Sequence, residues 1–339
     1  MKILVTGNAG FIGHHVHKRL VAAGHEVIGI DNLNNYYDVN LKLARLNQCG
    51  FNWENIAYGR RVESTHDGSL FYQLDLADEA AINKLFLNHK FDLVCHLAAQ
   101  AGVRYSVENP NAYISSNVNG FLHIIEGVRN FGIKHLIYAS SSSVYGNNSK
   151  IPFSVDDSCD HPISLYAATK KSNELMAHCY SHLYGLKTIG LRFFTVYGPW
   201  GRPDMALFQF TKAILENKPI PVFGHGRLKR DFTYIDDIVE GIVKSIEYCV
   251  GQPVGDTPFY KIYNIGNGNP VALLDFIKAI EKCLNKKAVL DLLPLQPGDV
   301  IQTWADTASI QRDIGFCPRT DIQCGVSSFV NWYRDFYRC

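Results

Sequence analysis

Short apolar runs alternate with longer amphipathic stretches through the first part of the chain, up to residue 195. The run Lys2–Thr6 predicts a strand, and residues 11–23 after it place their apolar side chains on one face of a helix. The run Glu26–Asp31 predicts a second strand. Further strands are expected at 92–98, 135–140 and 188–195, with helices at 111–131 and 165–184. This order predicts an α/β fold with a Rossmann-type doubly wound parallel sheet and right-handed crossovers.

The alternation stops after Tyr197. Prolines and glycines divide the next segment into short pieces, and helices are expected at 206–216, 273–284 and 321–338. We interpret residues 1–198 as the sheet domain. Residues 199–339 are interpreted mainly as a smaller C-terminal lobe, some segments of which return to the main sheet.

Composition narrows the classes of partner. The chain has 339 residues, of which 47% are hydrophobic and 19% charged, so it can bury a large core. Its net charge of +1 provides no electrostatic field that would attract nucleic acid or an acidic membrane. Nine cysteines without metal-ligand spacing indicate reduced thiols and no metal site. With no signal-peptide pattern and no apolar stretch of about 20 residues, we expect a cytoplasmic protein.

A glycine-rich turn follows the first strand and opens the first helix. Gly7, Gly10 and Gly13 would let backbone amides and the positive helix end approach a pyrophosphate. Asp31, at the end of the second strand, suits the two hydroxyls of an adenosine ribose and would repel a 2′-phosphate. With Asn32 beside it and no arginine, NAD is the expected cofactor. The alternative, a glycine turn that only tightens packing, stays open.

Other positions near this turn complete the expected cofactor site. Asp75, followed by Leu76, ends a further expected strand, the third along the chain, which precedes the one at 92–98. Asp75 would contact the adenine, although an aspartate there also suits a helix cap. The cofactor-binding set expected from the sequence is Gly7, Gly10, Phe11, Ile12, Gly13, Asp31, Asn32, Asp75, Leu76, Tyr166 and Lys170.

Tyr166 and Lys170 form the candidate catalytic pair. Their spacing of four places them on one face of a helix, where an ammonium group favours tyrosinate and lowers a phenol pKa that is otherwise about 10. Such a pair can remove a proton from a sugar hydroxyl. A run of four serines, Ser140 to Ser143, lies upstream of it. The alternative is a half-buried helix tyrosine with no catalytic task.

Several motifs carry a family resemblance over nearly the whole chain. They are TGNAGFIG at 6–13, AAQAGVRYS at 98–106, RFFTVYGP at 192–199, GRPDMA at 201–206 and KRDFTYIDD at 229–237. With the serine run and the Tyr-Lys pair, they resemble the extended short-chain dehydrogenases/reductases that act on nucleotide sugars. More closely, they resemble the UDP-glucuronate 4-epimerases, NAD-dependent isomerases of carbohydrate metabolism and polysaccharide biosynthesis.

The resemblance implies oxidation and re-reduction at carbon 4 of the sugar. Tyr166 would take the proton of the 4-hydroxyl while carbon 4 gives a hydride to NAD, with Ser141 and Ser142 assisting. Lys170 would bind the nicotinamide ribose and hold Tyr166 ionised. The 4-keto sugar would then turn over and take the hydride back on its other face.

The serines distinguish this reaction from those of related enzymes. Related 4,6-dehydratases carry Asp-Glu where this chain has Ser142 and Ser143, and related UDP-glucuronate decarboxylases carry a glutamate at the second position. The resemblance implies that Ser141, Ser142 and Ser143 hold the sugar carboxylate with Thr195, which replaces an asparagine of UDP-galactose 4-epimerases. The alternative for the serines is a polar strand end without a ligand.

The remaining substrate contacts also follow from the resemblance. Arg202 and Arg230 would bind the diphosphate of UDP, and Asp299 would face the uridine ribose. Arg104 stays unassigned. Family members pair as homodimers through helices that correspond here to 111–131 and 165–184. The alternative functions are a 4-epimerase of neutral or N-acetylated UDP-hexoses, then a UDP-glucuronate decarboxylase, then a non-catalytic NAD-binding protein.

Overall fold

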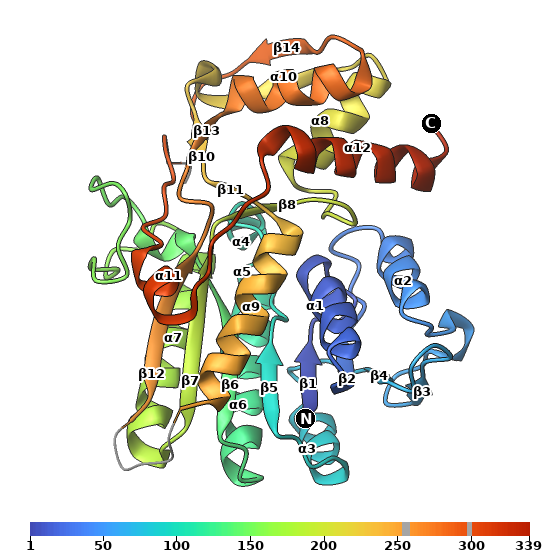
Figure 1. Cartoon of the computed structure of the whole chain (residues 1–339), viewed down its shortest axis with the longest axis vertical. Coiled ribbons are helices and arrows are strands. Elements are labelled where there is room, and N and C mark those ends of the chain that lie inside the picture. The colour runs from blue at the N-terminus through green and yellow to red at the C-terminus, as the bar shows by residue number, and fades with distance from the viewer. Residues whose placement is uncertain (253–257, 297–299) are drawn as a thin grey trace. The chain divides into compact units, whose positions relative to one another are not determined.

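A computed structural model describes residues 1–252, 258–296 and 300–339 (Figure 1). The chain divides into two compact units, which we describe separately. Unit 1 comprises Met1–Gly146, Ser158–Arg192 and Val239–Tyr263, and unit 2 comprises Asn147–Asp157, Phe193–Ile238 and Asn264–Cys339. Asp299, the expected ribose contact, lies outside the described residues.

Unit 1 is built on the predicted Rossmann-type sheet. Among the described residues this sheet has eight strands in the order β12-β7-β6-β5-β1-β2-β4-β3. The pairs β1–β2, β1–β5, β2–β4 and β5–β6 are parallel, as expected, whereas β3 at the edge runs antiparallel to β4. The strands are β1 (Lys2–Thr6), β2 (Glu26–Asp31), β3 (Arg61–Glu63), β4 (Leu70–Gln73), β5 (Leu93–His96), β6 (His135–Ser141), β7 (Lys187–Phe193) and β12 (Tyr260–Ile265).

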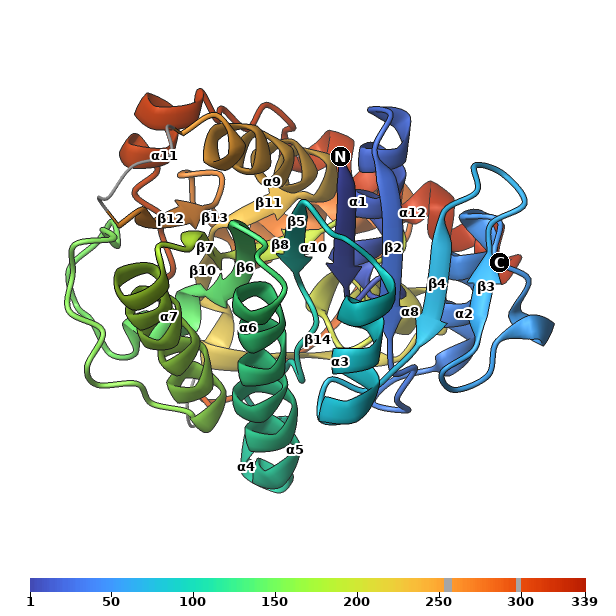
Figure 2. The ribbon, with the colours of Figure 1, turned by 90° about the horizontal axis from the view of Figure 1, so that it is seen from below.

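Helices cover this sheet on two faces. Helices α1 (Phe11–Ala22) and α9 (Ile235–Val250) lie on one face, and α3 (Glu79–Asn88), α6 (Gly120–Asn130) and α7 (Leu165–Tyr184) lie on the other (Figure 2). Leu4, Val94 and Leu136 from the central strands are fully buried and pack in one cluster with Ile124 and Val128 of α6. Apolar strands buried under helices on both faces are the reason that a parallel sheet forms here.

One helix predicted at 111–131 is divided in the structure. A short α5 (Pro110–Tyr113) leads into a π-helical stretch, η2 (Ile114–Asn119), before α6 begins at Gly120. A π-helical stretch inserts an extra residue into the helix and is frequent at functional sites. Helix α7, in contrast, has the predicted bounds, because Ser164 caps its first turn and Gly185 ends it in the left-handed conformation.

Unit 2 consists of short strand pairs and helices. The predicted strand 188–195 is divided, since β7 ends at Phe193 and β8 (Thr195–Tyr197) pairs instead with β11 (Phe232–Tyr234). The rings of Phe232 and Phe276 stack at 4.0 Å in its core. The other elements are α8 (Ala206–Leu215), β9 (Pro219–Val222), β10 (Lys229–Arg230), β13 (Val271–Ala272), α10 (Leu273–Leu284), β14 (Val289–Leu292), α11 (Ala308–Ile314) and α12 (Ile322–Tyr337).

Within the described part of the chain, we find no helix with the length and apolar character needed to cross a membrane.

Candidate active site

The glycine-rich turn between β1 and α1 needs its glycines. Gly7 has a φ of +73°, and a Cβ there would lie 2.9 Å from the backbone of Ala98. A Cβ on Gly13 would lie only 2.0 Å from the carbonyl oxygen of Gly7, and one on Gly10 would lie 2.9 Å from it. The packing interpretation therefore holds for Gly7 and Gly13, but it does not exclude ligand binding by the same turn.

The start of α1 suits an anion. Gly10 is the N-cap residue, and in the described residues no side chain caps the helix there. The amides of the first turn are thus available to a phosphate group, which the helix dipole also favours. Phe11 and Ile12 are the first two residues of α1; Phe11 is buried and Ile12 is half-buried. This cradle of small residues at an uncapped helix end fits the pyrophosphate of NAD.

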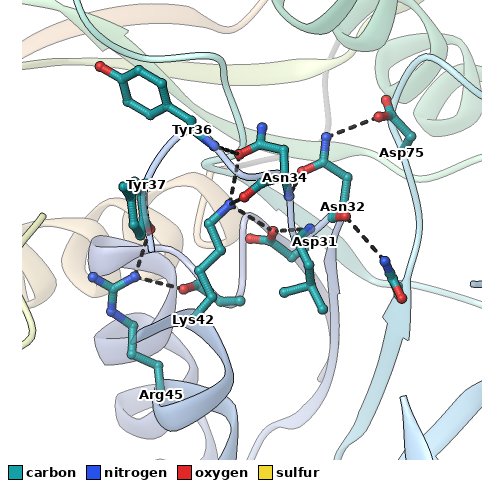
Figure 3. Close-up of polar contacts among 11 residues, drawn as sticks. Asp31, Asn32, Asn34, Tyr36, Tyr37, Lys42, Arg45 and Asp75 are labelled. Atoms are coloured by element: carbon teal, nitrogen blue, oxygen red, sulfur yellow. Dashed lines mark hydrogen bonds and ion pairs between the residues drawn. The ribbon is translucent and has the colours of Figure 1, made fainter. Parts of the chain in front are cut away.

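The three polar residues expected at the adenosine end lie together (Figure 3). Asn32 donates a hydrogen bond to Asp75 at 3.0 Å, and Asp31 accepts one from the amide of Leu33 at 2.8 Å. The other oxygen of Asp75 accepts from the amide of Ala77. The cap of α3 is Asp78 instead. Asp75 is therefore part of the polar cluster around Asp31, and its helix-cap alternative is wrong.

A cavity of about 540 Å³ adjoins this cluster. Its lining is rich in amide and hydroxyl groups, which suits a nucleoside with many hydrogen-bonding groups. Leu76, which follows Asp75 in the chain, is buried, and its carbonyl oxygen lies 2.7 Å from His123 Nδ1 of α6. The lining residues are Asn32, Asn34, Asn35, Tyr36, Asp75, Gln100, Tyr105, Asn109, Ala112, Ser115 and Ser116.

Sequence reasoning missed two cations that helix α2 (Val39–Gln48) brings to this cluster. Lys42 donates to the side chain and carbonyl of Asn34 and lies 3.9 Å from the carboxylate of Asp31. Arg45 is fully buried and donates to the carbonyl of Ala9 in the glycine-rich turn at 2.9 Å (Figure 3). The sequence did hold a signal for these two cations. Lys42 and Arg45 are three positions apart, which places them on one face of a helix whose neighbouring residues are apolar. The cation beside Asp31 is a lysine, so it does not contradict the expectation that no arginine adjoins this residue.

Tyr166 and Lys170 occupy the first turns of α7. Lys170 is almost fully buried, and its ammonium donates to the carbonyl oxygen of Ala139 at 2.8 Å. Burial lowers the pKa of Lys170 to about 8. The ring of Tyr166 meets the ring of Tyr113 edge-to-face, with centroids 6.0 Å apart. Since Ala139 directly precedes the serine run, Lys170 is attached to the strand that carries those serines.

The four serines have different surroundings. Ser140 is buried and donates to Glu174 at 2.7 Å. Ser141 ends β6 and caps the short helix η3 (Ser142–Tyr145), because its hydroxyl accepts from the amide of Ser143 at 3.1 Å. The hydroxyls of Ser141 and Ser143 also lie 3.1 Å apart. The run is therefore a strand end followed by a tight turn, which presents hydroxyl groups but no carboxylate.

A buried ion pair stands beside the serines, and sequence reasoning did not assign it. Glu174 accepts two hydrogen bonds from Arg192, each of 2.8 Å. Both side chains are at most 3% exposed. Burial alone would raise the pKa of Glu174, but the hydrogen bonds and charge of Arg192 outweigh it and lower that pKa. Arg192 also donates to the hydroxyl of Tyr145 at 3.0 Å.

A second unassigned network links the π-helical stretch to α7. Asn117 accepts from the amide of Gln100 at 2.8 Å and donates to its carbonyl at 3.0 Å. It also donates to the hydroxyl of Thr169, which in turn donates to the carbonyl of Tyr166. The carbonyl of Asn117 accepts from Asn173. These bonds explain the irregular helix, because they hold Asn117 against both the 97–104 loop and helix α7.

The other expected substrate contacts lie in unit 2. Thr195 begins β8, and its amide donates to the carbonyl of Asp231 at 3.0 Å. Arg202 forms a two-pronged ion pair with Asp204. Arg230 donates to the carbonyls of Lys229 and Ile301. Arg104, in unit 1, stands at the N-cap of a short helix, α4 (Tyr105–Glu108).

Residues 3–266 match the NAD dependent epimerase/dehydratase family. The chain belongs to this family. It is 45% identical to a probable UDP-glucuronate 4-epimerase of Rhizobium meliloti (strain 1021), a match that covers 100% of this chain and 98% of that protein.

Solved structures agree with the assignment to this family. The crystal structure of UDP-glucuronic acid 4-epimerase from Bacillus cereus, in complex with UDP-glucuronic acid and NAD, matches with a TM-score of 0.86 and 33% identity over 99% of this chain and 100% of that chain. UDP-glucose 4-epimerase of Thermotoga maritima matches with a TM-score of 0.84 and 30% identity, over 99% of this chain and 100% of that chain. The predicted fold, family and dependence on NAD are confirmed.

Proposed function

We propose that this chain is an NAD-dependent UDP-glucuronate 4-epimerase, which interconverts UDP-glucuronate and UDP-galacturonate through a transient 4-keto sugar. The observation that carries the proposal is the turn Ser141–Ser143, attached through Ala139 to Lys170 and free of any acidic side chain. The named relative and the Bacillus cereus enzyme support the same activity.

The catalytic helix would perform the proton transfer. Tyr166 accepts the proton of the 4-hydroxyl and later returns it, while the ammonium of Lys170, one helical turn away, favours the ionised phenol. A pKa of about 8 leaves Lys170 mostly protonated at neutral pH. When bound, NAD supplies the hydride acceptor and donor for carbon 4. Ser141 and Ser142 would hydrogen-bond the reacting oxygen.

The cofactor would be held by unit 1. The turn with Gly7, Gly10 and Gly13 would bind the pyrophosphate, since small residues surround the uncapped start of α1. Asp31, Asn32 and Asp75 would bind the adenosine, beside the polar cavity. Lys42 offsets part of the charge of Asp31 and keeps the loop after β2 in place.

The carboxylate of the sugar distinguishes the substrate. A 4-keto uronic acid is a β-keto acid, and it loses carbon dioxide when its carboxylate bond aligns with the carbonyl π system. Hydroxyl groups of Ser141, Ser142, Ser143 and Thr195 would hold the carboxylate out of that alignment without acting as a base. Arg202, Arg230 and Asp299 would bind the UDP half.

A substrate panel tests the proposal. Purified protein is incubated with UDP-glucuronate, UDP-glucose and UDP-N-acetylglucosamine, and the products are followed by proton NMR. We expect UDP-galacturonate as the main product, and we expect Tyr166→Phe to lose roughly 10²–10⁴-fold in rate. Faster turnover of either neutral sugar would favour the hexose epimerase alternative. A pentose as the main product would favour the decarboxylase.

We also propose a homodimer that assembles through α6 and α7. These neighbouring helices carry exposed apolar side chains, and Leu175 and Leu183 are 56% and 65% exposed. Leu122 and Tyr184 add to this apolar surface. Exposed apolar side chains that gather on one surface mark a contact with a partner.

The nine free thiols are consistent with the reducing cytoplasm, where we expect the enzyme to act.

A further inference from the structure

The serine turn is attached at both of its ends to one buried ion pair. Glu174 and Arg192 are joined by two hydrogen bonds and are withdrawn from water. Glu174 accepts from Ser140, immediately before the turn, and Arg192 donates to Tyr145, at the end of it. The guanidinium of Arg192 also lies 4.9 Å from the ring centroid of Tyr145. The four residues between these two anchors are Ser141 to Ser143 and Val144.

Packing alone does not favour a buried ion pair at this place. Burying two charges is costly, and an apolar pair of similar volume would often pack at least as well. The fork of Arg192 matches the carboxylate in a fixed plane, so Ser140 and Tyr145 are held in fixed positions relative to each other. Helix α7 and strand β7, which carry the two charges, are both parts of unit 1. The pair thus transmits the rigidity of two long elements to a short turn.

We propose that Glu174 and Arg192 are positioning residues that hold the serine turn rigid, so that the substrate carboxylate is kept out of the alignment that releases carbon dioxide. This inference rests on the proposed function. Neither residue touches the substrate in this proposal. Their task is to keep the proportion of turnovers that end in the epimer high.

The side reaction that they suppress has a defined balance. Carbon 4 has been oxidised and its hydride is on the cofactor. The bond between carbons 5 and 6 then breaks, carbon dioxide leaves, and the electron pair enters the enolate formed by carbons 4 and 5. A proton from water adds at carbon 5. The products are a UDP-4-keto-pentose, carbon dioxide and a cofactor left reduced.

The test measures how each variant divides its turnovers. Holoenzyme is given UDP-glucuronate labelled with ¹³C at carbon 6, and labelled bicarbonate and UDP-galacturonate are quantified by ¹³C NMR. The variants are Glu174→Gln, Ser140→Ala and Tyr145→Phe. The control is Val128→Ala, which opens a cavity in the buried face of α6, in the core cluster that contains Val94 and Leu136.

We expect the ratio of carbon dioxide to epimer to rise about tenfold in Glu174→Gln, the size expected when a hydrogen bond to a charged group is lost. Ser140→Ala and Tyr145→Phe each remove one anchor and should raise the ratio less. Val128→Ala should lower the Tm but keep the wild-type ratio. If Glu174→Gln does not fold, the two single-anchor variants decide.

A wild-type ratio in the folded anchor variants would overturn the inference and leave the pair a purely structural role. Failure of the proposed function would be seen separately, because the wild-type enzyme would then make no UDP-galacturonate. Elevated release of labelled carbon dioxide in a variant whose wild type is a clean epimerase would support both.

Discussion

Lys170 keeps an ammonium group out of water beside the carbonyl of Ala139. Removing a charge from water is unfavourable, and this is why burial lowers its pKa to about 8. The chain tolerates that cost where Tyr166 stands one helical turn away. A stable fold alone would not need a lysine at this position, which supports the catalytic role proposed for the residue.

Replacing this lysine should separate stability from activity. The folded-state pKa lies below the unfolded value, so the buried charge destabilises the fold fully below about pH 8 and progressively less as the pH rises toward 10. Lys170→Met should therefore gain roughly 1–3 kcal/mol of stability near pH 7 while losing activity. The gain should shrink in alkaline solution.

Thermal unfolding of the NAD-free protein across this pH range checks the expectation. Lys84→Met, at an exposed position of α3, is the matched control and should leave the Tm unchanged. A Lys170→Met variant less stable than wild type at every pH would show that the bond to Ala139 outweighs the cost of the buried charge.

At the scale of elements, α5, η2 and α6 show how a local pattern is overridden. The sequence between 111 and 131 predicts one regular helix, yet Asn117 is held by Gln100 and Thr169, and the backbone adopts a π-helical stretch around it. Three side-chain hydrogen bonds and a buried amide outweigh the slightly better geometry of a regular helix. Through Asn117, the irregular stretch connects the loop after β5 to helix α7.

The apolar surface of α6 and α7 makes a prediction about assembly. A charged residue buried in a dimer interface would be left without a partner, so Leu175→Asp should shift the protein from dimer toward monomer. Leu87→Asp, at a 72% exposed position on α3, should leave the assembly unchanged. Size-exclusion chromatography with light scattering measures the mass. A wild-type monomer, or a Leu175→Asp dimer, would contradict the proposed interface.

At the scale of the whole molecule, the fold does not select the sugar. The Bacillus cereus uronic acid epimerase and the Thermotoga maritima glucose epimerase match the chain with TM-scores of 0.86 and 0.84. The same scaffold supports both substrates, and function must be argued from the site. In the function proposed for this chain, the distinguishing groups are the serine turn and Thr195.

The preference for NAD over NADP can be measured as a difference in the Tm of the protein with each cofactor. A ligand that binds the folded state at about one hundred times its Kd adds about 2.7 kcal/mol. NAD should therefore raise the Tm clearly, and NADP less at equal concentration, because its 2′-phosphate would face the carboxylate of Asp31. Asp31→Asn should narrow the difference. Equal shifts for both cofactors in the wild type would mean that Lys42 cancels the charge of Asp31.

The sequence by itself determined the features that depend on neighbours along the chain. The alternation of strands and helices, the glycine turn, Asp31 at a strand end and the spacing of Tyr166 and Lys170 are all local patterns with a fixed period. Local patterns suffice because backbone geometry translates them directly into a face of a helix or an end of a strand. Motifs of the same kind identified the family.

Tertiary structure decided the features that join distant segments. Lys42 reaches Asp31 from another element, Lys170 reaches Ala139 across 31 positions, and Arg192 reaches Tyr145 across 47. No period in the sequence announces such contacts, because packing of helices on the sheet brings those side chains together. The sequence thus predicted which groups would react at carbon 4. Packing decided which distant side chains contact the two ends of the serine turn.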